Sequence, residues 1–457
     1  MTVIPKPIQK SLQKYNTPQI LRGSWYTTWG VSLLLLIVSI HGINSQRQAI
    51  KTVGKDAAPS VLTAQQLQDS FADIDASLAN ELLLKPGDDR QVLLDFKKNQ
   101  KKIADRLVAA AKNITYPEEE QIIQALQFNI SDYFLKLQEA RDAHKRGDAV
   151  STLSIYQSAA NLMDRDIIPQ AEKLSQVNSQ ALEKTYAEQS VTNGGIGLLI
   201  ILIGLAQIAA LIWIQLFLYQ RMRRILNLPL LGATAIAVIF LGYTSVAFVG
   251  ATNNLKVAKV DAFDSLNALR KMRSLSYRAN ADESRYLLDR SNSARHEQSF
   301  NDKVNKILTI PDQKISIENI IANVNQEIST PGLTGLFSTG LNNITFVGEK
   351  AAAIDTLKAW NDYLKIDKQI RQLATSGKIN EAIALCVGTK QGESNWAFER
   401  YKDLHTNLME VNKKEFDKNI ELGNDRVANF EIIAAVALSS IAILTLVGVR
   451  PRLLEYL

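Results

Sequence analysis

The sequence predicts an all-α integral membrane protein with four transmembrane helices and two tandem antiparallel four-helix-bundle extracytoplasmic domains, related by internal duplication. Two observations lead to this fold class. Apolar residues, 46% of the 457, gather into four runs instead of being spread evenly. In addition, the hydrophilic stretch after the first run resembles the one after the third. A duplicated unit of span, outer domain and span accounts for both.

The four apolar runs are predicted membrane spans, at residues 25–43, 194–219, 228–251 and 430–449. At about 1.5 Å of helix rise per residue, each can cross about 30 Å of hydrocarbon. The first run is long, opens on Trp25 and has no evident small-residue cleavage site, so we expect a retained anchor instead of a signal peptide. Gln207 and Gln215 are polar within the second run, and we expect them to hydrogen-bond to neighbouring spans.

Basic residues flank the runs on one side of the membrane. Because Lys and Arg accumulate in cytoplasmic segments, they place both termini in the cytoplasm of a bacterial inner (plasma) membrane protein that crosses the membrane several times. Outside these cytoplasmic segments, which also hold Glu455, the chain has 43 basic and 45 acidic residues and is slightly acidic. A nucleic-acid partner, which would need a basic face on a folded domain, is therefore not expected. The flanking residues are Lys6, Lys10, Lys14, Arg22, Arg221, Arg223, Arg224, Arg450 and Arg452, and the first seven are candidates to contact lipid or a cytoplasmic partner.

These spans divide the chain into nine predicted parts. They are a cytoplasmic tail (1–24), a span (25–43), an outer bundle (44–193), a span (194–219), a cytoplasmic loop (220–227), a span (228–251), a second outer bundle (252–429) with an insertion at about 310–340, a span (430–449) and a cytoplasmic tail (450–457). The inner parts are too short to hold a kinase or cyclase, so we expect any inward signal to pass to a separate protein.

The two copies align by eye with three successive offsets. At an offset of 204, Leu83 and Phe96 fall on Leu287 and Phe300, and the first span falls on the third. After a 26-residue insertion the offset is 230, and residues 113–116 (Asn-Ile-Thr-Tyr) meet 343–346 (Asn-Ile-Thr-Phe). A shift of four more residues pairs Asn178 with Asn412. The copies run from about residue 25 to 219 and from 229 to 449.

Helix breakers predict four helices in each outer domain. In copy one the breakers lie at residues 85–88, at residues 113–117 and at Gly147. Thr115 and Glu118 have the spacing of a capping box, so the Asn-Ile-Thr motif is expected to start the third helix, with a ligand contact as the alternative. Apolar residues recur every three positions from Val257 to Leu275, which favours helix over strand.

No short motif points to catalysis, a cofactor or a metal. The four histidines are far apart in sequence, and there is no paired-cysteine, zinc-protease or phosphate-loop pattern. The spans carry no charged residue at mid-membrane depth, which argues against an ion-coupled transporter. The lone Cys386 cannot form an intramolecular disulfide and is expected to be a small buried side chain. We therefore predict that the protein is not an enzyme and has no cofactor.

Two outer segments are candidate ligand- or partner-binding sites. Residues 274–298 are rich in charge, with Arg278, Asp282, Glu283 and Arg285, and are either a solvated helix face or a site where arginines hold a carboxylate ligand or partner. The insertion belongs to copy two alone. Its apolar residues are either a knob on which another protein docks or a cover for the bundle's own core; they are Leu333, Leu336 and Phe337.

The predicted architecture resembles the four-helix-bundle sensory domains of chemotaxis receptors and sensor kinases. Residues 280–288 (NADESRYLL) and 343–349 (NITFVGE) are similar to stretches of the GlnX-like family of four-span bacterial membrane signalling proteins. That resemblance implies a relay, in which an amino-acid-loaded periplasmic binding protein for glutamate or asparagine docks outside and a soluble Ser/Thr kinase is regulated inside.

The sequence thus favours a non-enzymatic transmembrane sensor or adaptor that passes an outer signal to a separate cytoplasmic protein. Two alternatives stay open: a structural or scaffolding subunit of a membrane complex, and a direct small-molecule receptor. The expected partners are membrane lipid, a periplasmic binding protein and a cytoplasmic kinase or other output protein, and association into a homodimer is left open.

Overall fold

The computed structural model describes residues 16–86, 90–222, 227–310, 316–326, 328 and 332–455. Lys6, Lys10, Lys14, Arg223 and Arg224 lie outside these residues. Across the described ranges the chain is helical, and its only extended pairing is the isolated bridge between Thr309 and Thr334. The predicted all-α class is confirmed.

The helices fall into two compact units, which we call the span unit and the outer unit. The span unit takes its described residues from Met1–Lys51, Lys184–Leu255 and Asn419–Leu457. The outer unit comprises the described parts of Thr52–Glu183 and Lys256–Lys418. Each unit therefore contains chain from both predicted copies.

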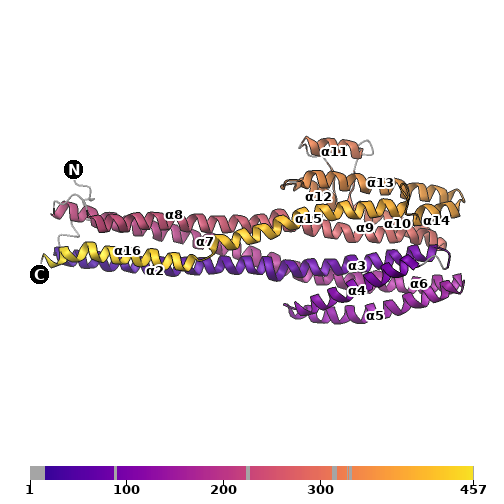
Figure 1. The fold of residues 1–457 in the computed structure, drawn as a ribbon, viewed down its shortest axis with the longest axis horizontal. Helices are drawn as coiled ribbons and strands as arrows, with labels where there is room; N and C mark the ends of the chain where they lie inside the picture. Colours follow the sequence, from indigo (N-terminus) through magenta and orange to yellow (C-terminus); the bar gives the residue numbers. More distant parts are fainter. Residues whose placement is uncertain are drawn as a thin grey trace. The chain divides into compact units, whose positions relative to one another are not determined.

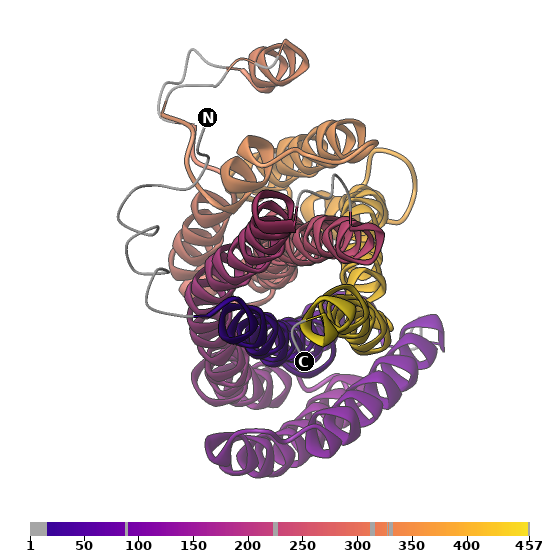
Figure 2. The ribbon, with the colours of Figure 1, turned by 90° about the vertical axis from the view of Figure 1, so that its left-hand side faces the viewer.

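The span unit contains the four predicted spans. Its helices are α2 (Thr17–Lys51), the later part of α7 (Ile168–Met222), α8 (Leu228–Lys256) and α16 (Phe430–Leu454), shown from one end in Figure 2. All four are long and apolar enough to cross a membrane. Gln207 Nε2 donates to Ser32 Oγ (2.9 Å) and Gln215 Nε2 donates to Thr234 Oγ1 (3.0 Å). The predicted hydrogen bonds between spans are confirmed, as expected where no water competes for the amides.

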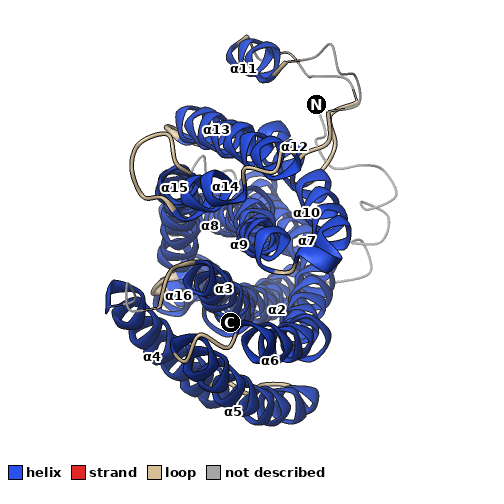
Figure 3. Ribbon diagram, turned by 90° about the vertical axis from the view of Figure 1, so that its right-hand side faces the viewer, coloured by secondary structure: helices blue, strands red, loops and turns tan. Residues whose placement is uncertain are grey.

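In the outer unit, the first long helices of the two copies pack together. These are α3 (Ala58–Leu83) and α9 (Asp264–Leu288). Figure 3 shows α4 (Arg90–Lys112), α5 (Pro117–Lys145) and α6 (Ala149–Leu162) on the α3 side. On the α9 side lie the helices of copy two, labelled in Figures 1 and 3. They are α10 (Ser293–Ile307), α11 (Ile317–Asn325), α12 (Leu336–Asn342), α13 (Glu349–Thr375), α14 (Ile379–Val387) and the earlier part of α15 (Ser394–Val427). The outer segments share one compact unit, and their division into two separate bundles stays a prediction.

Contacts between α3 and α9 follow the offset of the repeat. Asn80 Oδ1 accepts a hydrogen bond from Ser284 Oγ (2.7 Å), and Asp69 lies 4.0 Å from the Arg273 guanidinium. Both pairs are 204 residues apart, the offset that aligns the two copies. The two helices are therefore parallel and in register, so equivalent residues face one another as they do across the two-fold axis of a homodimer.

The Asn-Ile-Thr motif makes the same hydrogen bonds in both copies. Glu119 Oε2 accepts from the backbone N–H groups of Thr115 (2.6 Å) and Tyr116 (2.8 Å), and Glu119 Oε1 accepts from Asn178 Nδ2 (2.6 Å). In copy two, Glu349 accepts from the equivalent groups at 2.9, 3.1 and 2.9 Å. These matched contacts support the alignment of the copies, and the duplication itself stays a prediction.

The motif starts the third helix as expected, but the predicted cap is wrong in detail. The carboxylate belongs to Glu119 and not to Glu118, because α5 begins at Pro117 and its third residue is Glu119. The Thr115 hydroxyl does not cap the helix, since it donates to the carbonyl of Asn113 (3.3 Å).

Short π-helical segments occur at equivalent places near the start of each copy. They are η1 (Thr52–Ala57), which precedes α3, and η3 (Val257–Phe263), which precedes α9. Both lie within two residues of a boundary between the units. In copy one, Pro59 has no N–H to donate within the helix, which favours a locally altered hydrogen-bond ladder.

Candidate functional site

The charged segment that the sequence singles out lies mostly inside the protein. Between Ser274 and Leu287, nearly every residue of α9 is buried, and Asp282, Glu283 and Arg285 are 1–4% exposed. For this part of the segment the interpretation as a solvated helix face is therefore wrong, whereas Arg290 and Arg295, which follow α9, are exposed. The physical reason is that α9 packs on α3 on one side and on helices of its own copy on the other.

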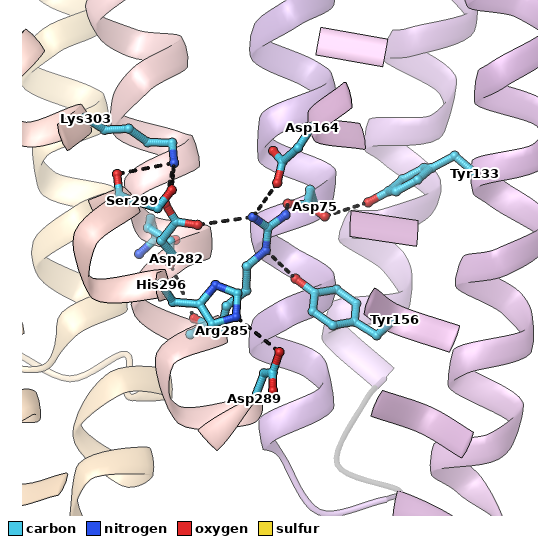
Figure 4. Close-up of polar contacts among 12 residues, drawn as sticks. Asp75, Tyr133, Tyr156, Asp164, Asp282, Arg285, Asp289, His296, Ser299 and Lys303 are labelled. Atoms are coloured by element: carbon cyan, nitrogen blue, oxygen red, sulfur yellow. Dashed lines mark hydrogen bonds and ion pairs between the residues drawn. The ribbon is translucent and has the colours of Figure 1, made fainter. Parts of the chain in front are cut away.

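Arg285 is the centre of this buried charge. Its Nη2 donates to Asp75 Oδ2 (2.6 Å), and its Nη1 reaches Asp164 Oδ2 (2.9 Å) and Asp282 Oδ1 (3.1 Å). Its Nε donates to the Tyr156 hydroxyl (3.0 Å). Figure 4 shows the guanidinium directed from α9 at these groups. The planar fork of donors suits a site with several acceptors at once.

Further polar groups complete the set that we call the interface network, defined as Asp75, Tyr133, Tyr156, Asp164, Asp282, Arg285 and Lys303. The Tyr133 hydroxyl donates to Asp75 (3.0 Å), and the Lys303 ammonium pairs with Asp282 (Figure 4). The first four residues come from copy one and the last three from copy two. The network therefore ties the two copies together through charge.

Burial dominates the electrostatics of the network. It raises the pKa of Asp75 to about 6, although the Arg285 cation acts in the opposite direction. For Arg285, burial acts to lower the pKa, but Asp75, Tyr156 and Asp164 outweigh it and hold the pKa well above its usual value. The guanidinium stays charged, and its carboxylate partners hold it in place.

Glu283 faces away from the interface network. Its Oε1 accepts a hydrogen bond from Ser394 Oγ (2.6 Å) and lies 3.6 Å from Cys386 Sγ. Burial, reinforced by the nearby Asp367, raises the pKa of Glu283 to about 8. Cys386 is fully buried, as expected for a small core side chain.

The other predicted site residues are dispersed. Arg278 is half-buried, with its Nη1 3.4 Å from Glu172 Oε1. Arg22 and Arg221 are exposed in the span unit. No group of three or more potential metal ligands occurs among the residues that the structure describes.

The end of the insertion that forms α12 covers the protein's own core. Phe337 is 3% exposed, and Leu333 and Leu336 are half-buried, so these three residues do not form an exposed knob. The reason is that α12 packs against α9 and α10. Leu336 instead lines a cavity of about 950 Å³ between helices of the two copies.

Sequence reasoning missed the copy-one half of the interface network. Asp75, Tyr156 and Asp164 are far apart in the chain, and no motif joins them. The one available signal was Tyr133, whose position in the repeat is again a tyrosine, Tyr363, in copy two.

One comparison with known proteins bears on the role of the outer unit. Residues 49–187 match the family model of the actinobacterial sensor domain. The match covers the outer segment of copy one and supports a bacterial sensor protein with a sensing or signalling role. No curated protein and no solved structure matches the chain.

Proposed function

We propose that this multi-pass membrane protein is a non-enzymatic transmembrane sensor that relays an extracytoplasmic signal to a separate cytoplasmic protein. The observation that carries the proposal is the match of residues 49–187 to a sensor domain, in a chain with four helices able to span a membrane. The loop at residues 220–227 is too short to hold an output domain, which supports a separate partner.

The helices provide a route for the signal. Helix α7 runs without interruption from Ile168 in the outer unit to Met222 in the span unit. Helical structure is likewise continuous from Thr17 to Leu83 and from Leu228 to Leu288, through the π-helical segments η1 and η3. Signalling displacements of helices are typically about 1–2 Å, and a continuous helix can transmit them.

In its most specific form, the proposal is a relay of the GlnX-like type. An amino-acid-loaded periplasmic binding protein would dock on the outer unit, and a cytoplasmic Ser/Thr kinase would bind the basic inner segments. Both termini would then be cytoplasmic in the inner membrane, as the flanking basic residues favour.

Affinity purification in mild detergent, after cross-linking in cells, tests this relay. We expect a periplasmic binding protein and a cytoplasmic kinase to co-purify with the chain, as identified by mass spectrometry. Recovery of a cell-envelope complex alone would contradict the relay and favour a structural subunit.

A further inference from the structure

We propose that the cavity between the two copies binds a small organic anion, with its charge carried by carboxylate or phosphate. The inference rests on the proposed sensing function and gives it a ligand site. The cavity has a volume of about 950 Å³, within the range of small-molecule sites. Its walls come from α3 and α7 of copy one and from α9, α10 and α12 of copy two.

The charges that line the cavity leave a positive excess. Both of its acidic residues are already engaged, because Glu183 pairs with Lys259, and Glu172 accepts a hydrogen bond from Gln68 (3.0 Å) and lies near Arg278. The exposed Lys271 and Lys306 have no ion-pair partner among the described residues. Two uncompensated ammonium groups at one cavity favour an anionic ligand.

The cavity also contains a buried polar group without a partner. Ser274 on α9 is 2% exposed, and its hydroxyl has no hydrogen-bond partner among the described residues. A buried hydroxyl without a hydrogen-bond partner is unfavourable, so a ligand that donates to it or accepts from it would bind more tightly. Ser175 and Gln176 add further polar groups from α7.

The equivalent serine in copy one has a hydrogen-bond partner within the protein. Ser70, 204 residues before Ser274, accepts a hydrogen bond from the Arg106 guanidinium. The same offset places Ile310 at the position of Arg106, beyond the end of α10. Copy one fills this place with its own side chain, and copy two leaves it open beside a cavity.

The insertion, which the alignment gives to copy two alone, builds one wall of the cavity. Gly335 has φ +101°, and a Cβ there would lie 2.7 Å from the carbonyl oxygen of Ile307. This close approach, together with the paired backbone hydrogen bonds between Thr309 and Thr334 (2.9 and 3.1 Å), fixes the start of α12. Without α12 the cavity would lose the wall formed by Leu336 and Thr339.

A ligand in this cavity would bridge helices of both copies. It would contact α7 within residues 172–183 and α9 within residues 271–275, and α7 continues to Met222. An anion held by Lys271 on α9 and by polar groups of α7 such as Ser175 would therefore favour one relative position of these two helices. This gives ligand binding a direct effect on a helix that reaches the span unit.

Isothermal titration calorimetry on the full chain in lipid nanodiscs tests the proposal. The probes are succinate, citrate, L-aspartate and inorganic phosphate, with putrescine as a cationic control and glycerol as a neutral one. We expect at least one anion to bind, and the Lys271→Gln/Lys306→Gln variant to bind it roughly tenfold or more weakly. Comparison of the carboxylates with phosphate identifies the anionic group.

Two controls separate ligand binding from folding. Lys365→Gln/Lys368→Gln changes two exposed lysines on α13, outside the cavity, and should leave affinity unchanged. Ser274→Ala should weaken binding without lowering the unfolding temperature of the ligand-free protein. The proposal is overturned if none of the anions binds, if the Lys271→Gln/Lys306→Gln variant binds equally well, or if putrescine binds instead. Partner co-purification measured on the same variants reports separately on the relay.

Discussion

At the scale of single residues, the decisive feature is the burial of Arg285 among three aspartates. A buried guanidinium is tolerated only when carboxylates and hydrogen bonds replace the water it has lost. Here Asp75 comes from α3 and Asp282 from α9, so one side chain satisfies acids from both copies. The cost of removing these charges from water offsets much of the stabilisation from the ion pairs. Removal of Arg285, however, would leave buried carboxylates without this partner.

Substitution of Arg285 by Met should reveal this cost. With the cation gone, Asp75 and Asp282 stay buried and lose a partner, so we expect the free energy of unfolding to fall by about 3–5 kcal/mol. Denaturant unfolding followed by circular dichroism measures the change. Arg295→Met, at an exposed position, is the matched control, with a change within about 0.5 kcal/mol. Equal stability of the two variants would contradict the role of Arg285.

The raised pKa of Glu283 predicts that the stability of the protein depends on pH. Its pKa is raised to about 8 by burial, whereas an unfolded glutamate ionises near pH 4.3. Between these values the folded state binds the additional proton, so stability falls as pH rises. Asp75 contributes in the same direction, but only up to about pH 6.

We therefore expect the unfolding temperature to fall between pH 6 and pH 8, and Glu283→Gln to flatten this dependence. Thermal unfolding across that range measures it. Glu410→Gln, at an exposed position on α15, should keep the full slope. A slope that is unchanged in Glu283→Gln would show that this carboxyl is not the group responsible.

At the scale of elements, the sequence predicts which helices form but not which of their faces are buried. Helix α9 has a mixed surface of apolar and charged residues, which is typical of a helix with one face in solvent. It is buried on both sides because α3 covers the face that a single four-helix bundle would leave exposed. Arg270 and Arg285 of α9 then pair with acids of α3, and Asp282 pairs with Lys303 of α10.

The start of the third helix in each copy gives a test at this scale. Glu119→Ala and Glu349→Ala each remove an acceptor of two backbone N–H groups and of a buried asparagine amide. We expect each to lower the free energy of unfolding by about 2 kcal/mol. Glu118→Ala, at the exposed neighbour, should have almost no effect in the same denaturant titration. A larger loss of stability in Glu118→Ala than in Glu119→Ala would instead favour the capping box predicted from the sequence, in which Glu118 supplies the carboxylate.

At the scale of the whole molecule, the predicted duplication would give the outer unit the organisation of a homodimer within one chain. Residues 204 apart meet along α3 and α9, and the insertion makes the two halves unequal. The cavity closed by the insertion then has no counterpart required by symmetry. In a homodimer of identical subunits, a site away from the two-fold axis would occur twice.

The outer segment of copy one should therefore not fold alone. Residues 44–193 expressed as a monomer would expose the face of α3 whose acids Asp69 and Asp75 pair with Arg270 and Arg285. We expect no cooperative thermal transition from this segment, measured by circular dichroism and sedimentation. The same segment joined to residues 252–429 by a flexible linker should unfold cooperatively. A monomeric segment that unfolds cooperatively would instead favour two separate bundles.

The sequence by itself determined the four spans, the helical class and the Gln207 and Gln215 hydrogen bonds. These depend on local hydropathy and helical periodicity, which can be read residue by residue. Only the tertiary structure decided that Asp282, Glu283 and Arg285 are buried, and that a cavity lies beside Ser274. Burial and cavities depend on which surfaces meet, and these surfaces belong to residues that are far apart in the chain, such as Arg285 and Tyr156, which are separated by 129 positions.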